Sequence, residues 1–113
     1  MKKQLAADPF RLNAEQIAWV EDTLASMSVE DRLHQLFCLI TYSDDPEELR
    51  TLAEQVRPGG IMSRAVPTEQ ALRTIRTLQE HSRIPLLISA NLEAGGNGLL
   101  TDGTLFAKPM AVA

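Results

Sequence analysis

The chain has 113 residues, of which 44% are apolar and 23% charged, and its formal net charge is −4. This length allows one small domain with an apolar core and excludes a complete (β/α)8 barrel, which needs roughly 200 residues or more. The mildly acidic charge and the scarcity of aromatic residues, at 4%, argue against nucleic-acid binding. No apolar run reaches the roughly 20 residues of a membrane span and no secretory leader is recognisable, so we expect a cytoplasmic protein without membrane contact.

Capping signals predict two helices after a loosely ordered arm of residues 1–12. Asn13, with Gln16 three residues later, forms a capping-box pattern, and apolar residues then recur on one helical face. Ser28 begins a similar pattern three residues ahead of an aspartate. We therefore assign residues 13–35 to N-terminal helices.

Short apolar runs and helix signals alternate in the rest of the chain. The pattern predicts strands at 36–41, 61–63 and 84–90, with helices that begin at Asp45-Pro46 and Pro67-Thr68. In the second of these helices, we expect Leu72, Ile75 and Leu78 to form the inward apolar stripe.

The spacing of these elements predicts the fold class. The strands begin about 24 residues apart with one helix in each gap, which is typical of parallel strands with right-handed crossovers. The prediction is an α/β fold with two N-terminal helices and then three parallel β/α units in residues 36–113. The single cysteine, Cys38, lies in the first apolar run and is predicted to be buried. No Cys/His cluster has metal-ligand spacing, so we expect no metal site.

The end of the third predicted strand carries the most informative polar residues. Asn91 and Glu93 follow this strand, and Gly95, Gly96 and Gly98 come directly after them. Ligands bind at the carboxyl ends of parallel strands, and residues two apart in an extended chain point the same way. The glycines permit a tight turn and a close approach of the backbone to a ligand. The pattern suits a site for a polar ligand such as sugar hydroxyls. The alternative, that Glu93 is solvated and the glycines only turn the chain, remains open on the local residues alone.

Other catalytic arrangements find little support. Residues 96–98, Gly-Asn-Gly, resemble the start of a dinucleotide fingerprint, but the third glycine, a prompt helix cap and an acidic ribose partner are missing. His34 and His81 lie on predicted helix surfaces without a nucleophile placed beside them, which argues against a triad. Asp45 is most simply a helix cap, and Asp102 with the following glycine a turn.

Four segments, in order and with matching spacing, resemble the N-terminal barrel domain of glycoside hydrolase family 3. They are residues 27–36, 58–64, 84–96 and 103–106 with 109–111, within a match that covers residues 17–113. The resemblance implies that the chain is a partial domain equivalent to the first part of a TIM barrel. It also implies retaining hydrolysis of a β-linked sugar, of β-N-acetylhexosaminidase or β-glucosidase type, without a metal or organic cofactor.

The resemblance also assigns substrate contacts. In the family, the third strand ends in an Asp-x-Glu-Gly-Gly-like sequence whose aspartate holds sugar hydroxyls. Here Asn91 stands at the matching position and Ala94 is inserted before the glycine pair. An amide still bonds to hydroxyls but lacks the charge that strengthens such bonds. The resemblance implies that Asn91 and Glu93 bind substrate, and Arg64 is either a third contact or a surface residue that caps a loop.

The resemblance places the catalytic groups elsewhere. In the family, the nucleophilic aspartate, the acid/base and a sugar-binding Lys-His pair lie beyond the segment that this chain matches. We therefore expect no catalytic residue here, and an N-terminal segment of a carbohydrate-metabolising glycosidase that is inactive alone. Its partner would be the carbohydrate substrate of the full-length enzyme.

An alternative interpretation is a complete, short, non-catalytic α/β module for binding or assembly. A three-stranded parallel sheet leaves its edges and an apolar face uncovered. We therefore expect self-association through the exposed sheet edges under this interpretation.

Overall fold

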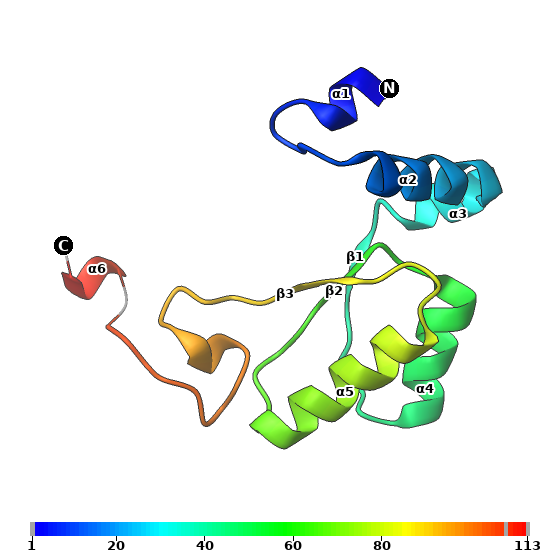
Figure 1. The fold of residues 1–113 in the computed structure, drawn as a ribbon. Helices are drawn as coiled ribbons and strands as arrows, with labels where there is room; N and C mark the ends of the chain where they lie inside the picture. Colours follow the sequence, from blue (N-terminus) through cyan, green and yellow to red (C-terminus); the bar gives the residue numbers. More distant parts are fainter. Residues whose placement is uncertain (1, 108, 113) are drawn as a thin grey trace. The chain divides into compact units, whose positions relative to one another are not determined.

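The computed structural model describes residues 2–107 and 109–112, and the chain divides into two compact units, residues 1–32 and 33–113 (Figure 1). Helices α1 (Lys2–Ala6) and α2 (Ala14–Ser26) belong to unit 1, and α3 (Val29–His34) leads from it into unit 2. The later elements, in chain order, are β1 (Cys38–Ile40), α4 (Pro46–Thr51), the π-helix η1 (Leu52–Val56), β2 (Gly60–Met62), α5 (Thr68–His81), β3 (Leu87–Ser89), the 3₁₀-helix η2 (Gly96–Gly98) and α6 (Pro109–Val112).

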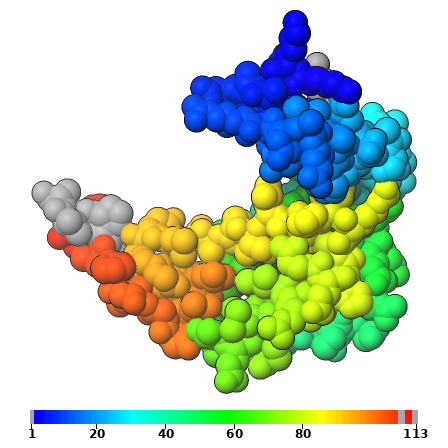
Figure 2. Space-filling model, in the orientation of Figure 1, coloured from blue at the N-terminus to red at the C-terminus, as the bar shows by residue number. Residues whose placement is uncertain are grey.

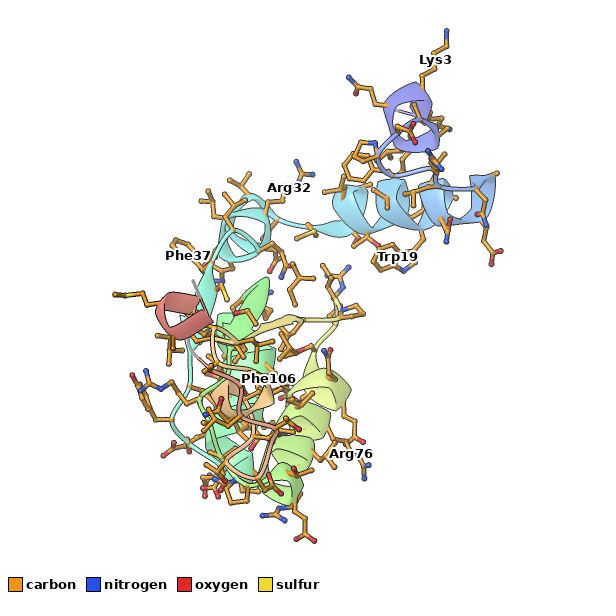
Figure 3. The ribbon with its side chains drawn as sticks, turned by 90° about the vertical axis from the view of Figure 1, so that its left-hand side faces the viewer. Lys3, Trp19, Arg32, Phe37, Arg76 and Phe106 are labelled. Carbon is orange, nitrogen blue, oxygen red and sulfur yellow. The ribbon has the colours of Figure 1, made fainter. Side chains whose placement is uncertain are left out.

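Unit 1 confirms the predicted capping signals. The Asn13 side chain accepts a hydrogen bond from the Gln16 amide and the Gln16 side chain accepts one from the Asn13 amide, both at 2.9 Å. The predicted arm contains the exposed helix α1. Figure 3 shows Trp19 on the side of α2 that faces away from α1, and its side chain is 55% exposed.

Unit 2 contains a sheet of three parallel strands in the order β1-β2-β3, so the predicted α/β fold is confirmed. α4 with η1 connects β1 to β2, and α5 connects β2 to β3. Each strand has three paired residues, fewer than predicted for β1 and β3. The central strand sets this length, because an outer strand can form a ladder only where β2 offers a partner.

One face of the sheet carries the core of unit 2. Ile61 in β2 is completely buried, and Leu49 of α4 and Leu78 of α5 are 2% and 1% exposed. Leu39 and Ile88, in the two outer strands, pack against this cluster. Alternate residues of a strand point to opposite faces, so the middle residues of all three strands meet the helices together.

The inward face of α5 differs from the predicted stripe. Ala71, Thr74 and Leu78 are buried, whereas Leu72 is 58% exposed and Ile75 is half-buried. The helix therefore turns its smaller side chains to the sheet, which permits close packing, and only Leu78 of the predicted stripe is fully buried.

The opposite face of the sheet is apolar but exposed. Ile40 and Leu87 are 47% and 78% exposed. Cys38 is exposed as well, so the prediction that it is buried is wrong. A continuous apolar run is typical of a strand covered on both faces, whereas α4 and α5 pack against the face that carries Ile61.

Two leucines of α5 provide a test of this packing. We expect Leu78→Ala to lower the free energy of unfolding by roughly 2 to 5 kcal/mol, since it opens a cavity in the core. The same truncation at exposed Leu72 should cost less than about 1 kcal/mol. Urea unfolding followed by circular dichroism measures both values. Equal losses for the two variants would contradict the packing of α5.

Candidate functional site

Because the strands are parallel, their carboxyl ends meet at one edge of the sheet. Arg64 follows the last residue of β2 by two positions, and Asn91 follows the last residue of β3 by two. A parallel bridge between Val66 and Leu100 joins the chain after β2 to the chain after β3. We call this edge the rim. It comprises residues 41–43, 63–66 and 91–102.

Backbone hydrogen bonds fix the chain after β3 against the chain after β2. The Val66 amide donates to the Leu99 carbonyl at 3.2 Å, and the Thr101 amide donates to the Val66 carbonyl at 2.9 Å. Further along, the Phe106 amide donates to the Ala94 carbonyl at 2.7 Å. The segment is therefore a folded loop held at two places, and the space-filling view shows it packed against the beginning of α5 (Figure 2).

Two glycines make this loop conformation possible. Gly95 has φ of 98°, and a Cβ there would lie 2.5 Å from the Thr104 carbonyl oxygen. A Cβ at Gly98 would lie 1.4 Å from the carbonyl oxygen of Asn91. The close approach at these glycines is therefore to the chain itself, and the predicted approach to a ligand stays a prediction.

Asp102 ties the loop to the start of α5. Its Oδ1 accepts hydrogen bonds from the Thr68 amide at 3.1 Å and from the Thr68 hydroxyl at 2.8 Å. The bond from the Thr68 hydroxyl is the main reason that the pKa of Asp102 is lowered. Sequence reasoning assigned Asp102 to a turn and missed this role. The sequence contained one signal for it: the helix begins after Pro67, whose side chain cannot cap the helix, so the cap had to come from another residue.

The predicted substrate contacts Asn91 and Glu93 are both exposed at the rim. Neither side chain has a hydrogen-bond partner among the residues that the structure describes. Glu93 lies in a turn closed by the bond from the Gly95 amide to the Leu92 carbonyl at 3.0 Å. The extended chain that would point both side chains the same way therefore ends before Glu93. Their role in binding stays a prediction.

Arg64 is exposed and stacks on the single tyrosine of the chain. Its guanidinium carbon lies 5.5 Å from the centroid of the Tyr42 ring, which is a cation–π contact between the ends of β2 and β1. Within the described residues, Arg64 forms no hydrogen bond or ion pair, so no loop-capping bond is seen. Its N–H groups remain available to a ligand.

A cavity of about 210 Å³ with a mixed polar and apolar lining lies beside Arg64. It is lined by residues from the ends of β1 and β2 and from the first turns of α5: Thr41, Tyr42, Ser43, Ser63, Arg64, Ala65, Val66, Gln70, Ala71 and Thr74. Ser63 and Thr74 are only 7% and 8% exposed. The Gln70 side chain donates to Asp44 at 2.9 Å, which joins α5 to the loop after β1.

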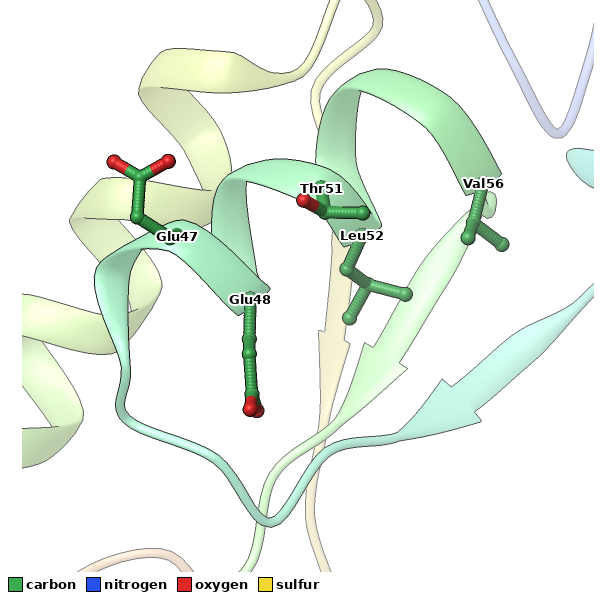
Figure 4. Close-up of a pocket in the computed structure, with 5 residues that line it drawn as sticks. All are labelled: Glu47, Glu48, Thr51, Leu52 and Val56. Atoms are coloured by element: carbon green, nitrogen blue, oxygen red, sulfur yellow. The ribbon is translucent and has the colours of Figure 1, made fainter.

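A larger groove of about 410 Å³ runs along α4 and η1 and is lined by Glu47, Glu48, Thr51, Leu52 and Val56 (Figure 4). It is mostly apolar and contains none of the predicted substrate contacts. The groove is therefore separate from the predicted substrate site at the rim.

The ionic cluster of unit 2 lies away from the rim. Glu54 of η1 accepts hydrogen bonds from Arg50 at 3.2 Å and lies 2.8 Å from Nδ1 of His81, at the carboxyl end of α5. The bond to His81, followed by that to Arg50, lowers the pKa of Glu54. This cluster joins η1 to α5, and the rim lies at the other end of that helix. Among residues 2–107 and 109–112, no three His, Cys, Asp or Glu side chains are grouped to hold a metal ion.

The α/β fold resembles the start of a barrel domain. Over 109 residues, 96% of its length, the chain is 46% identical to a β-N-acetylglucosaminidase/β-glucosidase from Cellulomonas fimi. Two solved structures of β-glucoside phosphorylase BglX, one of them bound to 2FGlc, match 96% of the chain with TM-scores of 0.81 and 0.78 at 39% and 40% identity.

These relatives confirm the resemblance to glycoside hydrolase family 3. The chain spans about a fifth of their length, 19% of the Cellulomonas protein and 20% and 19% of the BglX chains. No protein-family model matches the chain. Within the described part of the chain, no helix has the length and apolarity needed to cross a membrane.

The Asp102 contact gives a prediction for the loop. We expect Asp102→Ala to speed amide hydrogen exchange at Thr101 and Val66 by about tenfold, because the loop loses a charge-assisted anchor. Below about pH 4, acid should lower the protection of the same amides relative to their intrinsic exchange rates, since the lowered pKa keeps Asp102 ionised and bonded until the pH falls through it. Asp22→Ala in α2 serves as the control and should leave both amides unchanged. Unchanged exchange in Asp102→Ala would contradict the anchor.

Proposed function

We propose that the chain forms one wall of the sugar-binding site of a retaining β-glycosidase that acts on β-glucosides or β-N-acetylglucosaminides. The observation that carries the proposal is the 46% identity to the β-N-acetylglucosaminidase/β-glucosidase, over nearly the whole chain and only 19% of that relative. The rim supports it, since Asn91, Glu93 and Arg64 leave the carboxyl ends of neighbouring strands, where ligands of parallel sheets bind.

The proposed role of Asn91 is to hold substrate hydroxyls. Its amide offers two N–H donors and an acceptor oxygen, and a sugar hydroxyl can pair with either. Since the side chain has no partner among the described residues, binding a hydroxyl would break no bond within the protein. Glu93 would add a charged acceptor, and Arg64 would add donors from the second strand.

Bond cleavage is proposed to need groups outside the described residues. A retaining glycosidase places two catalytic side chains about 5 to 5.5 Å apart across the scissile bond. Two carboxylates near the rim already have partners, since Asp102 caps α5 and Asp44 binds Gln70. Among the described residues of the rim, Glu93 therefore has no second free carboxylate with which to form a catalytic pair. The relatives' names include a glycosidase and a phosphorylase, so the acceptor in the whole enzyme would be water or phosphate.

The purified 113-residue chain should therefore bind but not cleave substrate. We expect no release of nitrophenol above background from nitrophenyl β-glucoside or nitrophenyl β-N-acetylglucosaminide, with or without added phosphate. Absorbance assays measure this, and circular dichroism verifies that the chain is folded. Turnover that is lost in Glu93→Gln would overturn the assignment of a binding wall.

We also propose that the isolated chain self-associates through the uncovered face and edges of its sheet. The exposed side chains Ile40 and Leu87 form apolar surface on this face, and the outer strands β1 and β3 each have one unpaired edge within the sheet. This property is shared by the glycosidase segment and by a complete short assembly module. Translating the coding DNA past Ala113 distinguishes the two, because only the segment continues into further barrel units.

A pair of charge substitutions tests the surface. We expect Leu87→Glu to shift the chain from dimers or larger species toward monomer, because a carboxylate opposes burial of the sheet face. Leu72→Glu, on the outer side of α5, is the matched control and should leave the mass unchanged. Size-exclusion chromatography with light scattering gives the masses. A wild-type chain that stays monomeric at high concentration would argue against self-association.

A further inference from the structure

We propose that the 210 Å³ cavity between β1, β2 and α5 binds the hydroxyl groups of one neutral sugar unit, in addition to the contacts of Asn91 and Glu93. This inference rests on the proposed function, since it takes the ligand to be a β-glycoside. It assigns new binding residues, Ser63 and Thr74, that the sequence did not indicate.

The two buried hydroxyls carry the inference. Ser63 and Thr74 are more than nine-tenths buried and both line the cavity. Neither hydroxyl has a hydrogen-bond partner among the described residues. Neither hydroxyl oxygen is itself fully buried, so both are accessible from the cavity, and a ligand there could bond to them without breaking a hydrogen bond within the protein.

The wall after β1 adds further donors. The Thr41 hydroxyl accepts a bond from the Ser43 amide at 3.3 Å, and the Ser43 hydroxyl accepts one from the Asp45 amide at 3.1 Å. Each hydroxyl therefore retains its own O–H to donate. Arg64, held over Tyr42, contributes N–H groups at the same cavity. A ligand rich in hydroxyls matches this mixture of donors and acceptors.

The charges near the cavity favour a neutral ligand over an anion. Asp44 binds Gln70, which lines the cavity, and Asp102 binds Thr68, two residues earlier in α5. These carboxylates offset the single positive charge of Arg64 and would repel phosphate. Asp102 also occupies the amide of Thr68 at the start of α5, where an anion would otherwise bind. The small apolar side chains of Ala65 and Ala71 suit the C–H face of a sugar ring.

The chain contains its own reporters for a binding test. Tyr42 is the only tyrosine and lines the cavity, and Trp19 is the only tryptophan and lies in unit 1. We expect methyl β-D-glucoside, titrated into the labelled 113-residue chain, to shift the Tyr42 ring resonances saturably and leave the Trp19 indole unchanged. Inorganic phosphate, titrated separately, should produce no saturable shift of Tyr42.

Hydroxyl deletions test the contacts. Thr74→Val and Ser63→Ala should each weaken binding by roughly threefold to tenfold, because each removes a hydrogen bond to the ligand. Thr74→Ser should restore most of the affinity, and Thr77→Val, one turn later and outside the cavity, is the matched control. A gain in stability in Thr74→Val without any loss of binding would show that the hydroxyl faces only water, and would overturn the inference.

The two proposals give separate readouts. The side-chain amide of Asn91 reports on the rim outside the cavity. Shifts at Asn91 without shifts at Tyr42 would overturn the cavity and leave the proposed function standing. Saturable shifts of Tyr42 that persist in Asn91→Ala support the cavity, whether or not Asn91 contributes. Tighter binding of phosphate than of the glucoside would overturn the neutral-sugar assignment.

Discussion

The pairing of β2 with both neighbours is the interaction on which unit 2 depends. Three residues, Gly60–Met62, hold the parallel ladders on both sides, and the completely buried Ile61 anchors α4 and α5 to one face. Because all three strands run in one direction, polar residues that follow them collect at a single edge. The parallel connection from β2 to β3 also places the first turns of α5 at that edge. The contacts of β2 therefore position the sheet, the helix and the rim together.

The rim is rigidified by bonds that cross long stretches of sequence. Val66 pairs with the chain after β3, and Asp102 caps a helix that begins 34 residues earlier. These contacts determine where Asn91 and Arg64 can lie relative to each other, although neither side chain takes part in them. Substrate contacts would therefore be presented on a preformed surface, which reduces the conformational entropy lost on binding.

Local signals in the sequence predicted local structure well. The capping box of Asn13 and the cap at Asp45 depend on neighbours within a few residues, and both are present in the structure. Burial was harder to predict, because it depends on which face of an element is covered. Cys38 and Leu72 are apolar residues in regular elements, yet both are exposed. Ser63 and Thr74 gave no signal, and Asp102 gave only the indirect one of a helix that begins at Pro67 without a capping side chain, because the importance of all three arises only when distant segments meet.

The uncovered sheet face and the rim belong to the same interpretation. Apolar side chains such as Leu87 would be buried if further strands closed the sheet into a barrel, and each further parallel strand would add its carboxyl end to the same rim. On this interpretation, binding residues and catalytic carboxylates come from different parts of one long polypeptide. Asn91 then has a distinct consequence, because an amide does not titrate and its bonds to hydroxyls are the same at every pH at which the protein is folded. The pH dependence of such an enzyme would then come from its catalytic carboxylates, and the hydrogen bonds of Asn91 to the sugar would not change with pH.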